Sequence, residues 1–176
     1  MGIGGLYGKS SWLNQMKPYQ LGGEMIDKVT FAKTTYNEIP YKFEAGTPNV
    51  ADVIGLGAAI NYLQQIGWDF IRTQETDLLN YATASLQAIE GVKIIGTAVH
   101  KAAIVSFLIE GIHFFDAGTI LDHMGIAVRT GNHCTQPLMD FLGINGTLRA
   151  SMAFYNTREE IDRLVAGIHQ VKTLFA

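Results

Sequence analysis

A chain of 176 residues has the length of one domain, or of one small domain plus a remnant of another, and is short for two full domains. Its net charge of −3, with scattered basic residues and short apolar runs, argues against nucleic acid and membranes as partners and predicts a cytoplasmic protein. The 48% content of hydrophobic residues indicates an interface with another chain or segment. A single cysteine excludes an internal disulfide framework.

The first third of the sequence predicts short and irregular elements. We expect a short helix up to Met16 that Ser10 or Ser11 caps, and Pro18 ends it because a residue before proline avoids helical geometry. Residues 19–48 predict loops between short strands. Loops of this kind commonly lie at surfaces or at binding sites.

Two long helices are expected next. The first has apolar residues at helical spacing from Val50 to Leu63, with Asn49 as a possible cap and Gly67 as its end. The second carries an apolar stripe from Ile71 to Ile89 and stops at Gly91.

From residue 71 onward the predicted order of elements is α-β-β-α-β-α-β-α, which is typical of helices packed on one face of a sheet. Residues rich in β-branched side chains predict strands at 92–95, 103–109, 126–129 and 147–154. Helices are expected at 116–124, 137–142 and 157–175, the last with a capping box formed by Thr157 and Glu160.

The loop from Ala127 to Met139 combines Arg, His, Cys, Asn and Gln side chains between a predicted strand and a short helix. A thiol beside a cation and at a helix start is stabilised as the thiolate, so Cys134 is a candidate nucleophile. The alternative from composition alone is a buried, inert thiol. His133 is not assigned as its base, because neighbouring side chains in an extended loop point apart.

Motifs along nearly the whole chain resemble the group II cysteine desulfurases, a family that includes selenocysteine lyases. The motifs are Gly2–Gly8, Gly22–Ile26, Phe43–Asn49, Arg129–Met139 and Leu148–Asn156, in the family's order. The resemblance implies an α/β fold: residues 66–176 as the C-terminal small domain of a fold-type I PLP-dependent transferase, with a mixed sheet and helices packed on one face. Residues 1–65 would be a remnant of the large PLP-binding domain and the linking helix.

The resemblance also implies roles for single residues. PLP would act as electron sink, and Cys134 would take sulfur from cysteine, or selenium from selenocysteine, with alanine and a persulfide as the products on the sulfur route. Arg149 matches the arginine that holds the substrate carboxylate, whereas Arg129 either contacts substrate or forms a structural ion pair. Thr47 and Gly46 match residues that reach across a homodimer to the PLP phosphate, with a plain turn as the alternative.

Some family features are missing. The Schiff-base lysine falls before the first residue in the family's order, and Lys9, Lys17 and Lys28 have the wrong context to replace it. We therefore expect that the chain alone turns over no cysteine. Smaller departures include Asn132 and Thr135, where many relatives have His and Ala.

The partners that the resemblance implies are cysteine or selenocysteine, a second copy of the chain, and a sulfur-acceptor protein of the kind that serves iron–sulfur cluster assembly. A non-catalytic module that accepts sulfur on Cys134 or binds a sulfur carrier is one alternative. An unrelated ferredoxin-like domain with an inert thiol is another. No metal is assigned, since ligand spacing is lacking among His100, His113, His123 and His169.

Overall fold

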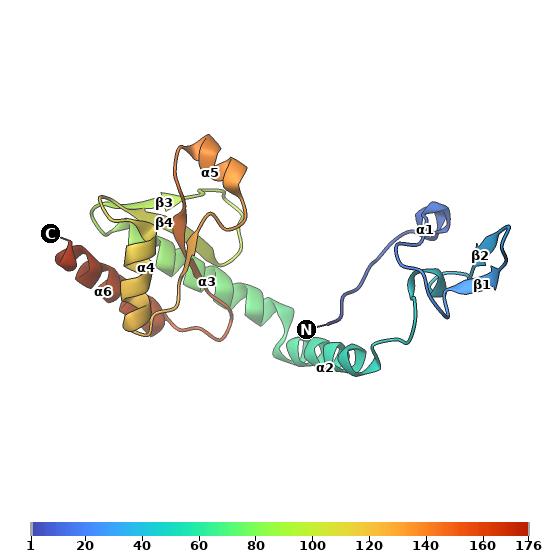
Figure 1. Ribbon diagram of the computed structural model, residues 1–176. Helices are drawn as coiled ribbons and strands as arrows, with labels where there is room; N and C mark the ends of the chain where they lie inside the picture. Colours follow the sequence, from blue (N-terminus) through green and yellow to red (C-terminus); the bar gives the residue numbers. More distant parts are fainter. Residues whose placement is uncertain (1, 176) are drawn as a thin grey trace. The chain divides into compact units, whose positions relative to one another are not determined.

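The computed structural model describes residues 2–175, and the chain divides after residue 65 into two compact units. We call them the N-terminal unit, residues 1–65, and the C-terminal unit, residues 66–176; Figure 1 follows them by colour along the chain. Among the described residues, no helix has the length and apolar character needed to cross a bilayer.

The N-terminal unit consists of short elements joined by loops. They are α1 (Ser10–Gln15), β1 (Ile26–Val29), β2 (Thr34–Tyr36), a single 3₁₀ turn (Tyr41–Phe43) and α2 (Val50–Ile66). Strands β1 and β2 pair antiparallel as a hairpin. Met25 is the one hydrophobic side chain described in this unit that is fully buried, so the unit has almost no core of its own.

The helix ends of this part of the chain agree only partly with expectation. Neither predicted serine caps α1, whose N-cap is Lys9 with no capping side-chain bond. Asn49 does cap α2, since its Oδ1 accepts from the backbone N–H of Asp52 at 3.3 Å. Gly67, at φ 92°, separates α2 from α3 as predicted, because this left-handed geometry suits a residue without Cβ.

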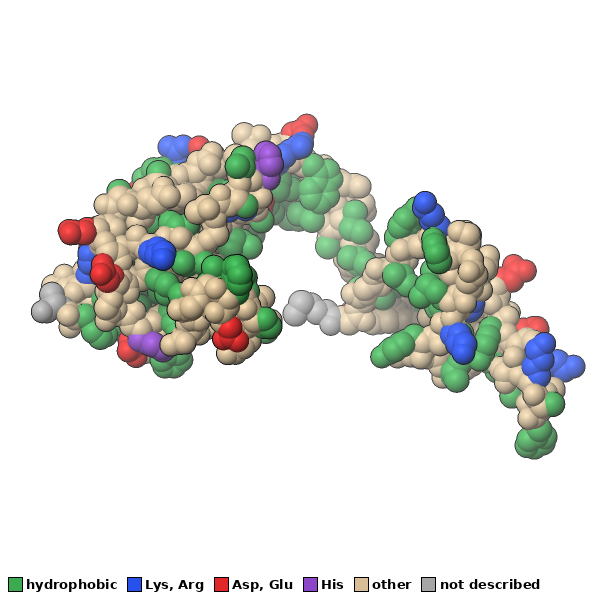
Figure 2. All heavy atoms as spheres, turned by 90° about the horizontal axis from the view of Figure 1, so that it is seen from above, with side chains coloured by type: hydrophobic (Ala, Val, Ile, Leu, Met, Phe, Trp, Pro, Cys, Tyr) green, Lys and Arg blue, Asp and Glu red, His purple; other side chains and the backbone are tan. Residues whose placement is uncertain are grey.

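Helix α2 is apolar but has no buried residue. Exposed hydrophobic side chains cover it: Val50, Val53, Ile54, Leu56, Ile60 and Tyr62. Figure 2 draws hydrophobic side chains in green where they lie on the surface of the molecule. A helix of this kind is typical of a segment that packs against another chain or domain.

The C-terminal unit has the predicted order of elements. Its bounds are α3 (Trp68–Gln87), β3 (Val92–Ile95), β4 (Ile104–Ile109), α4 (Phe114–His123), β5 (Arg129–Gly131), α5 (Gln136–Leu142), β6 (Thr147–Ser151) and α6 (Arg158–Leu174). The predicted capping box at the start of α6 is present, with the Glu160 carboxylate accepting from the Thr157 N–H at 2.9 Å.

The four strands form one sheet in the order β3-β4-β6-β5, and all three pairings are antiparallel. The prediction of a mixed sheet is therefore wrong in this detail. The strands that run in the same direction, β4 with β5 and β3 with β6, are never neighbours in this order.

The strand predicted at 126–129 is also misplaced. Strand β5 begins only at Arg129, where pairing with Arg149 of β6 starts. Ile126 and Val128 instead pack against the core from the preceding loop, so their apolar character signals burial without strand pairing.

The core lies between the sheet and helices α3, α4 and α6, which cover one of its faces (Figure 1). Alternate residues of β4 point into this core, and Val105, Phe107 and Ile109 are all buried. Their neighbours on the opposite face include Ser106, which pairs with Arg149 and is only partly buried. Arg149 therefore lies on the face away from the helices.

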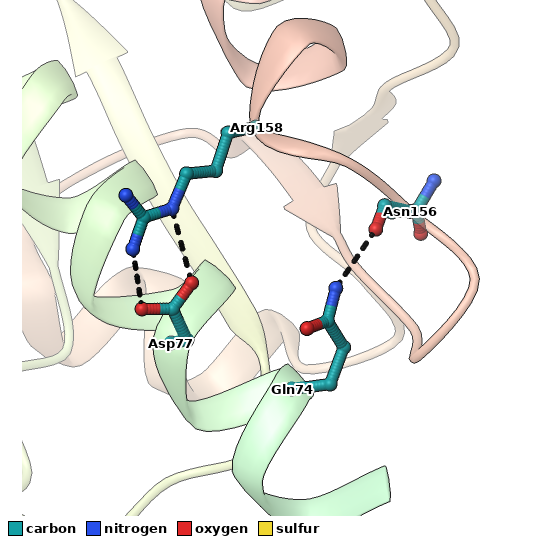
Figure 3. A network of polar contacts seen from close by, with 4 residues as sticks. All are labelled: Gln74, Asp77, Asn156 and Arg158. Atoms are coloured by element: carbon teal, nitrogen blue, oxygen red, sulfur yellow. Dashed lines mark hydrogen bonds and ion pairs between the residues drawn. The ribbon is translucent and has the colours of Figure 1, made fainter. Parts of the chain in front are cut away.

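Polar contacts between α3 and the start of α6 fix the segment that follows β6 (Figure 3). Nε and one terminal nitrogen of Arg158 donate to the two carboxylate oxygens of Asp77 at 3.0 and 2.6 Å. Gln74 donates to the backbone carbonyl of Asn156 at 3.3 Å. The bidentate pair of Arg158 with Asp77 holds the pKa of Asp77 below its ordinary value. The hydrogen bonds from Arg158 have the larger effect, and the charge of Arg158 adds to it.

Candidate active site

Cys134 lies in the loop between β5 and α5, and its thiol is exposed. The alternative of a buried thiol is therefore wrong. The loop is not extended as expected, because His133 and Cys134 adopt left-handed φ angles of 52° and 62°. Each such non-glycine residue costs on the order of 1–3 kcal/mol, and such residues cluster at active sites and ligand-binding loops.

Asn132 organises this loop. Its Oδ1 accepts from the backbone N–H of Cys134 at 3.2 Å, and its Nδ2 donates to Oε1 of Gln136, the first residue of α5, at 2.9 Å. Its backbone carbonyl accepts from both the N–H and the hydroxyl of Thr135, at 2.9 and 2.7 Å. The sequence gives no sign of these contacts, because they exist only in the left-handed turn.

His133 points back to the sheet. Its Nε2 is 2.9 Å from the hydroxyl of Thr147, a residue of β6 that is fully buried, while its buried Nδ1 has no hydrogen-bond partner. Burial lowers the pKa of His133, and the charge of Arg149 lowers it further, with a smaller effect from Arg129. The imidazole is therefore biased toward its neutral form.

Two arginines lie beside this loop, on β5 and β6. Arg129 and Arg149 are direct cross-strand partners, a position in which Cβ atoms are about 4.5–5.5 Å apart. The Nε of Arg149 is buried without a hydrogen-bond partner, and among the described residues neither arginine forms an ion pair. The structural ion pair considered for Arg129 is thus not found in this part of the chain.

Such a pair of guanidinium groups is suited to an anion. A planar carboxylate can accept from the fork of an arginine through two parallel hydrogen bonds. It would also give the buried Nε of Arg149 the partner that it lacks.

Thr47 and Gly46 lie in the N-terminal unit and so are not in the same unit as Cys134. The N–H of Gly46 donates to the carbonyl of Gly23 at 2.9 Å, and its φ of 82° makes the turn. Thr47 is exposed, and its hydroxyl makes no hydrogen bond to any described residue. The Thr47 hydroxyl therefore fits a phosphate contact, whereas the Gly46 amide is already engaged within the chain.

The C-terminal unit thus brings Cys134, Arg129 and Arg149 to one loop and two adjoining strands. Sequence reasoning missed the contacts of Asn132 and of Thr147. Thr147 had one usable signal: it stands two residues before Arg149 in the same strand, which places both side chains on one face of the sheet.

Comparisons with known proteins agree on a single family. The model of the aminotransferase class-V family matches residues 1–164. A probable cysteine desulfurase of Xylella fastidiosa is 50% identical over 173 residues, which cover 98% of this chain and 42% of that protein. A cysteine desulfurase of Synechococcus elongatus is 50% identical over 172 residues, covering 98% and 28%.

A solved structure gives the same result in three dimensions. The cysteine desulfurase of Escherichia coli in its S-sulfonic acid form is similar with a TM-score of 0.89 and 39% identity, over 96% of this chain and 42% of that chain. The present chain therefore spans less than half the length of the relatives that it matches.

Proposed function

Because this chain belongs to the aminotransferase class-V family, we propose that it is the C-terminal part of a PLP-dependent cysteine desulfurase. The observation that carries the proposal is the exposed thiol of Cys134 in a left-handed loop, where its neighbour His133 is within the electrostatic influence of Arg129 and Arg149. These two arginines pair across β5 and β6 and have no ion-pair partners among the described residues. A thiol held in this way can attack a substrate that the arginines hold by its carboxylate.

The two units have separate assignments in this proposal. The C-terminal unit is the small domain that carries the nucleophile. The N-terminal unit is a remnant of the large PLP-binding domain with the linking helix α2. Its lack of a core, with Met25 alone fully buried among its described hydrophobic side chains, supports a segment that folds against further chain.

Substrate binding begins at the arginines. Arg149 donates to the α-carboxylate of cysteine, and Arg129 adds a second positive charge from the adjacent strand. A carboxylate between them removes the repulsion of two like charges and fixes the orientation of the amino acid. The same contacts would hold selenocysteine, so these residues do not discriminate between the two substrates.

Cys134 then accepts the sulfur. PLP, when bound, supplies the electron sink that weakens the bond between the substrate's β-carbon and its sulfur. The thiolate of Cys134 attacks that sulfur, so that a sulfur–sulfur bond forms while the carbon–sulfur bond breaks. The electron pair of the broken bond stays with the carbon fragment, which takes up a proton and leaves as alanine.

The remaining roles depend on a second subunit and on an acceptor. We assign the Thr47 hydroxyl to the PLP phosphate of the partner subunit in a homodimer, with Gly46 shaping the turn. The exposure of Cys134 supports transfer of the persulfide sulfur to an acceptor protein.

The test is the Cys134→Ser variant of the complete enzyme, incubated with cysteine. We expect the unchanged enzyme to gain about 32 Da on Cys134, one sulfur atom, and to release alanine, and the variant to do neither. Release of alanine by the variant at the unchanged rate would contradict the assignment of Cys134.

A second arm uses the 176-residue chain by itself. It carries no lysine in the expected PLP context, so we expect no alanine from cysteine. Sulfur loading of Cys134 from a persulfide donor without PLP, together with an inactive complete enzyme, would favour the non-catalytic sulfur-accepting module instead.

A further inference from the structure

The side chain of Asn132 has two contacts that tie the residues around Cys134 to one another. One is the acceptor bond from the Cys134 N–H to Oδ1, and the other is the donor bond from Nδ2 to the side chain of Gln136. The first fixes the backbone of the nucleophile, and the second fixes the start of α5. The side-chain amide of Asn132 thus fixes both the backbone of Cys134 and the first residue of the helix that follows it.

We propose that Asn132 is a positioning residue, which acts through the backbone of Cys134 to aim the thiol at the substrate sulfur. This inference rests on the proposed role of Cys134 as the sulfur acceptor. Asn132 itself need not touch the substrate, because the oxygen and the nitrogen of its side-chain amide are already engaged by Cys134 and Gln136.

The need for such a residue follows from the backbone of the loop. His133 and Cys134 both have left-handed φ angles, which side chains with a Cβ disfavour, so an unsupported loop would relax toward extended geometry. Extended geometry would turn the Cys134 N–H away from Asn132 and would redirect the thiol. The bond to Oδ1 forms only in the bent state and therefore favours it.

Thr135 supports the same arrangement from the other side of the cysteine. Its hydroxyl and its N–H both donate to the carbonyl of Asn132, so the backbone and side chain of Asn132 are oriented together. Asn132 and Thr135 are therefore in direct contact through two hydrogen bonds to one carbonyl. This supports a loop anchor built from the pair.

The inference can be tested without catalysis. In the 176-residue chain, amide hydrogen exchange at Cys134 should accelerate roughly tenfold in Asn132→Ala, because the acceptor of that N–H is lost. Asn132→Asp keeps an acceptor oxygen and should stay within about threefold of the unchanged chain. Gln136→Leu is the matched control: it removes the bond to Nδ2 but leaves Oδ1 in place, and should also change little.

The catalytic readout uses the complete enzyme. We expect Asn132→Ala to lower the rate of persulfide formation by up to about 100-fold, the order of effect of a misplacement near 1 Å. The KM for cysteine should be unchanged, since Arg149 and Arg129 are untouched. Asn132→Asp should recover most of the rate, because it keeps the oxygen that accepts from the Cys134 N–H. A role of the amide in loop stability alone does not predict this recovery.

The outcomes separate this inference from the proposed function. Unchanged exchange and an unchanged rate in Asn132→Ala, or an Asp variant as slow as the Ala variant, would overturn the positioning role. Asn132→Leu provides a second test of the same loss if the Ala variant does not fold. Alanine release that persists in Cys134→Ser would instead overturn the role of the cysteine, whereas the exchange result would still report on Asn132.

Discussion

Arg129 and Arg149 stand directly opposite each other on the antiparallel strands β5 and β6. The Nε of Arg149 is buried without a partner, and neither guanidinium has an acidic partner among the described residues. Like charges in this position are destabilising. The C-terminal unit therefore contains an electrostatic repulsion between two guanidinium groups, which an anion bound between them would relieve.

The repulsion should be measurable as stability. We expect Arg129→Gln to raise the free energy of unfolding by about 0.5 kcal/mol at low ionic strength, the order of one cross-strand pair. The gain should shrink near ~1 M salt, where charges are screened over a few ångströms. Urea unfolding measures both values. Lys93→Gln is the control, since Lys93 faces the uncharged Leu108 across the sheet, and an equal gain there would contradict the interpretation.

Substrate binding should depend on the shape of the Arg149 side chain as well as on its charge. Arg149→Lys keeps the charge but loses the planar fork. Hydrogen bonds to charged groups contribute about 1.5–3 kcal/mol, so we expect the KM for cysteine in the complete enzyme to rise by roughly 10- to 100-fold. Steady-state kinetics would show this, with PLP absorbance as a check on cofactor binding. A lysine variant with unchanged KM would remove Arg149 from the carboxylate site.

The stability of the chain should respond to the titration of His133. Burial first, and Arg149 after it, lowers the pKa of His133 below its ordinary value of 6.5, so the folded chain binds fewer protons than the unfolded chain. Stability therefore falls as the pH decreases through about 6.5 and levels off below the folded-state pKa.

Thermal unfolding between about pH 8 and pH 5 measures this dependence. His133→Gln should flatten that part of the profile, while His169→Gln, at an exposed position of α6, should leave it intact. A profile that is equally steep in both variants would exclude His133 as its source.

Helix α4 approaches β5 so closely that a Cβ atom on Gly118 would overlap the methyl group of Thr130. We expect Gly118→Ala to lower the free energy of unfolding by about 1–3 kcal/mol, the usual cost of overpacking, although alanine favours a helix. Thr130→Ser removes that methyl group and should recover most of the loss in the double variant. Urea unfolding of the unchanged chain, the two single variants and the double variant measures these differences. A double variant no more stable than Gly118→Ala would refute the contact.

The arrangement of elements could be predicted where local patterns and packing agree. From residue 71 onward the order of helices and strands is confirmed, because periodicity reports burial on one face. The prediction of a strand at 126–129 is wrong because periodicity reports burial alone. Ile126 and Val128 are packed against the core but lie outside the paired strand. Apolar residues indicate burial and do not reveal which hydrogen bonds the backbone makes.

The site divides in a similar way. Cys134 and Arg129 stand in one motif and Arg149 in another, and the resemblance to the family pointed to all three. The role of Asn132 depends on two successive left-handed residues, and the pairing of Arg129 with Arg149 depends on the sheet order. Neither property follows from local sequence, since one arises from the turn geometry and the other from which strands become neighbours.

The exposure of Cys134 also bears on the lifetime of the persulfide that we propose it carries. A sulfur atom bound to an exposed thiol can be collected by an acceptor without any opening of the fold, but it can equally be met by peroxide or by the thiol of another molecule. Because these 176 residues hold one cysteine, no second thiol among them can reverse such damage by disulfide exchange. If Cys134 carries the proposed persulfide, the lifetime of that persulfide in air should depend on surrounding reductants and on how quickly the proposed acceptor arrives.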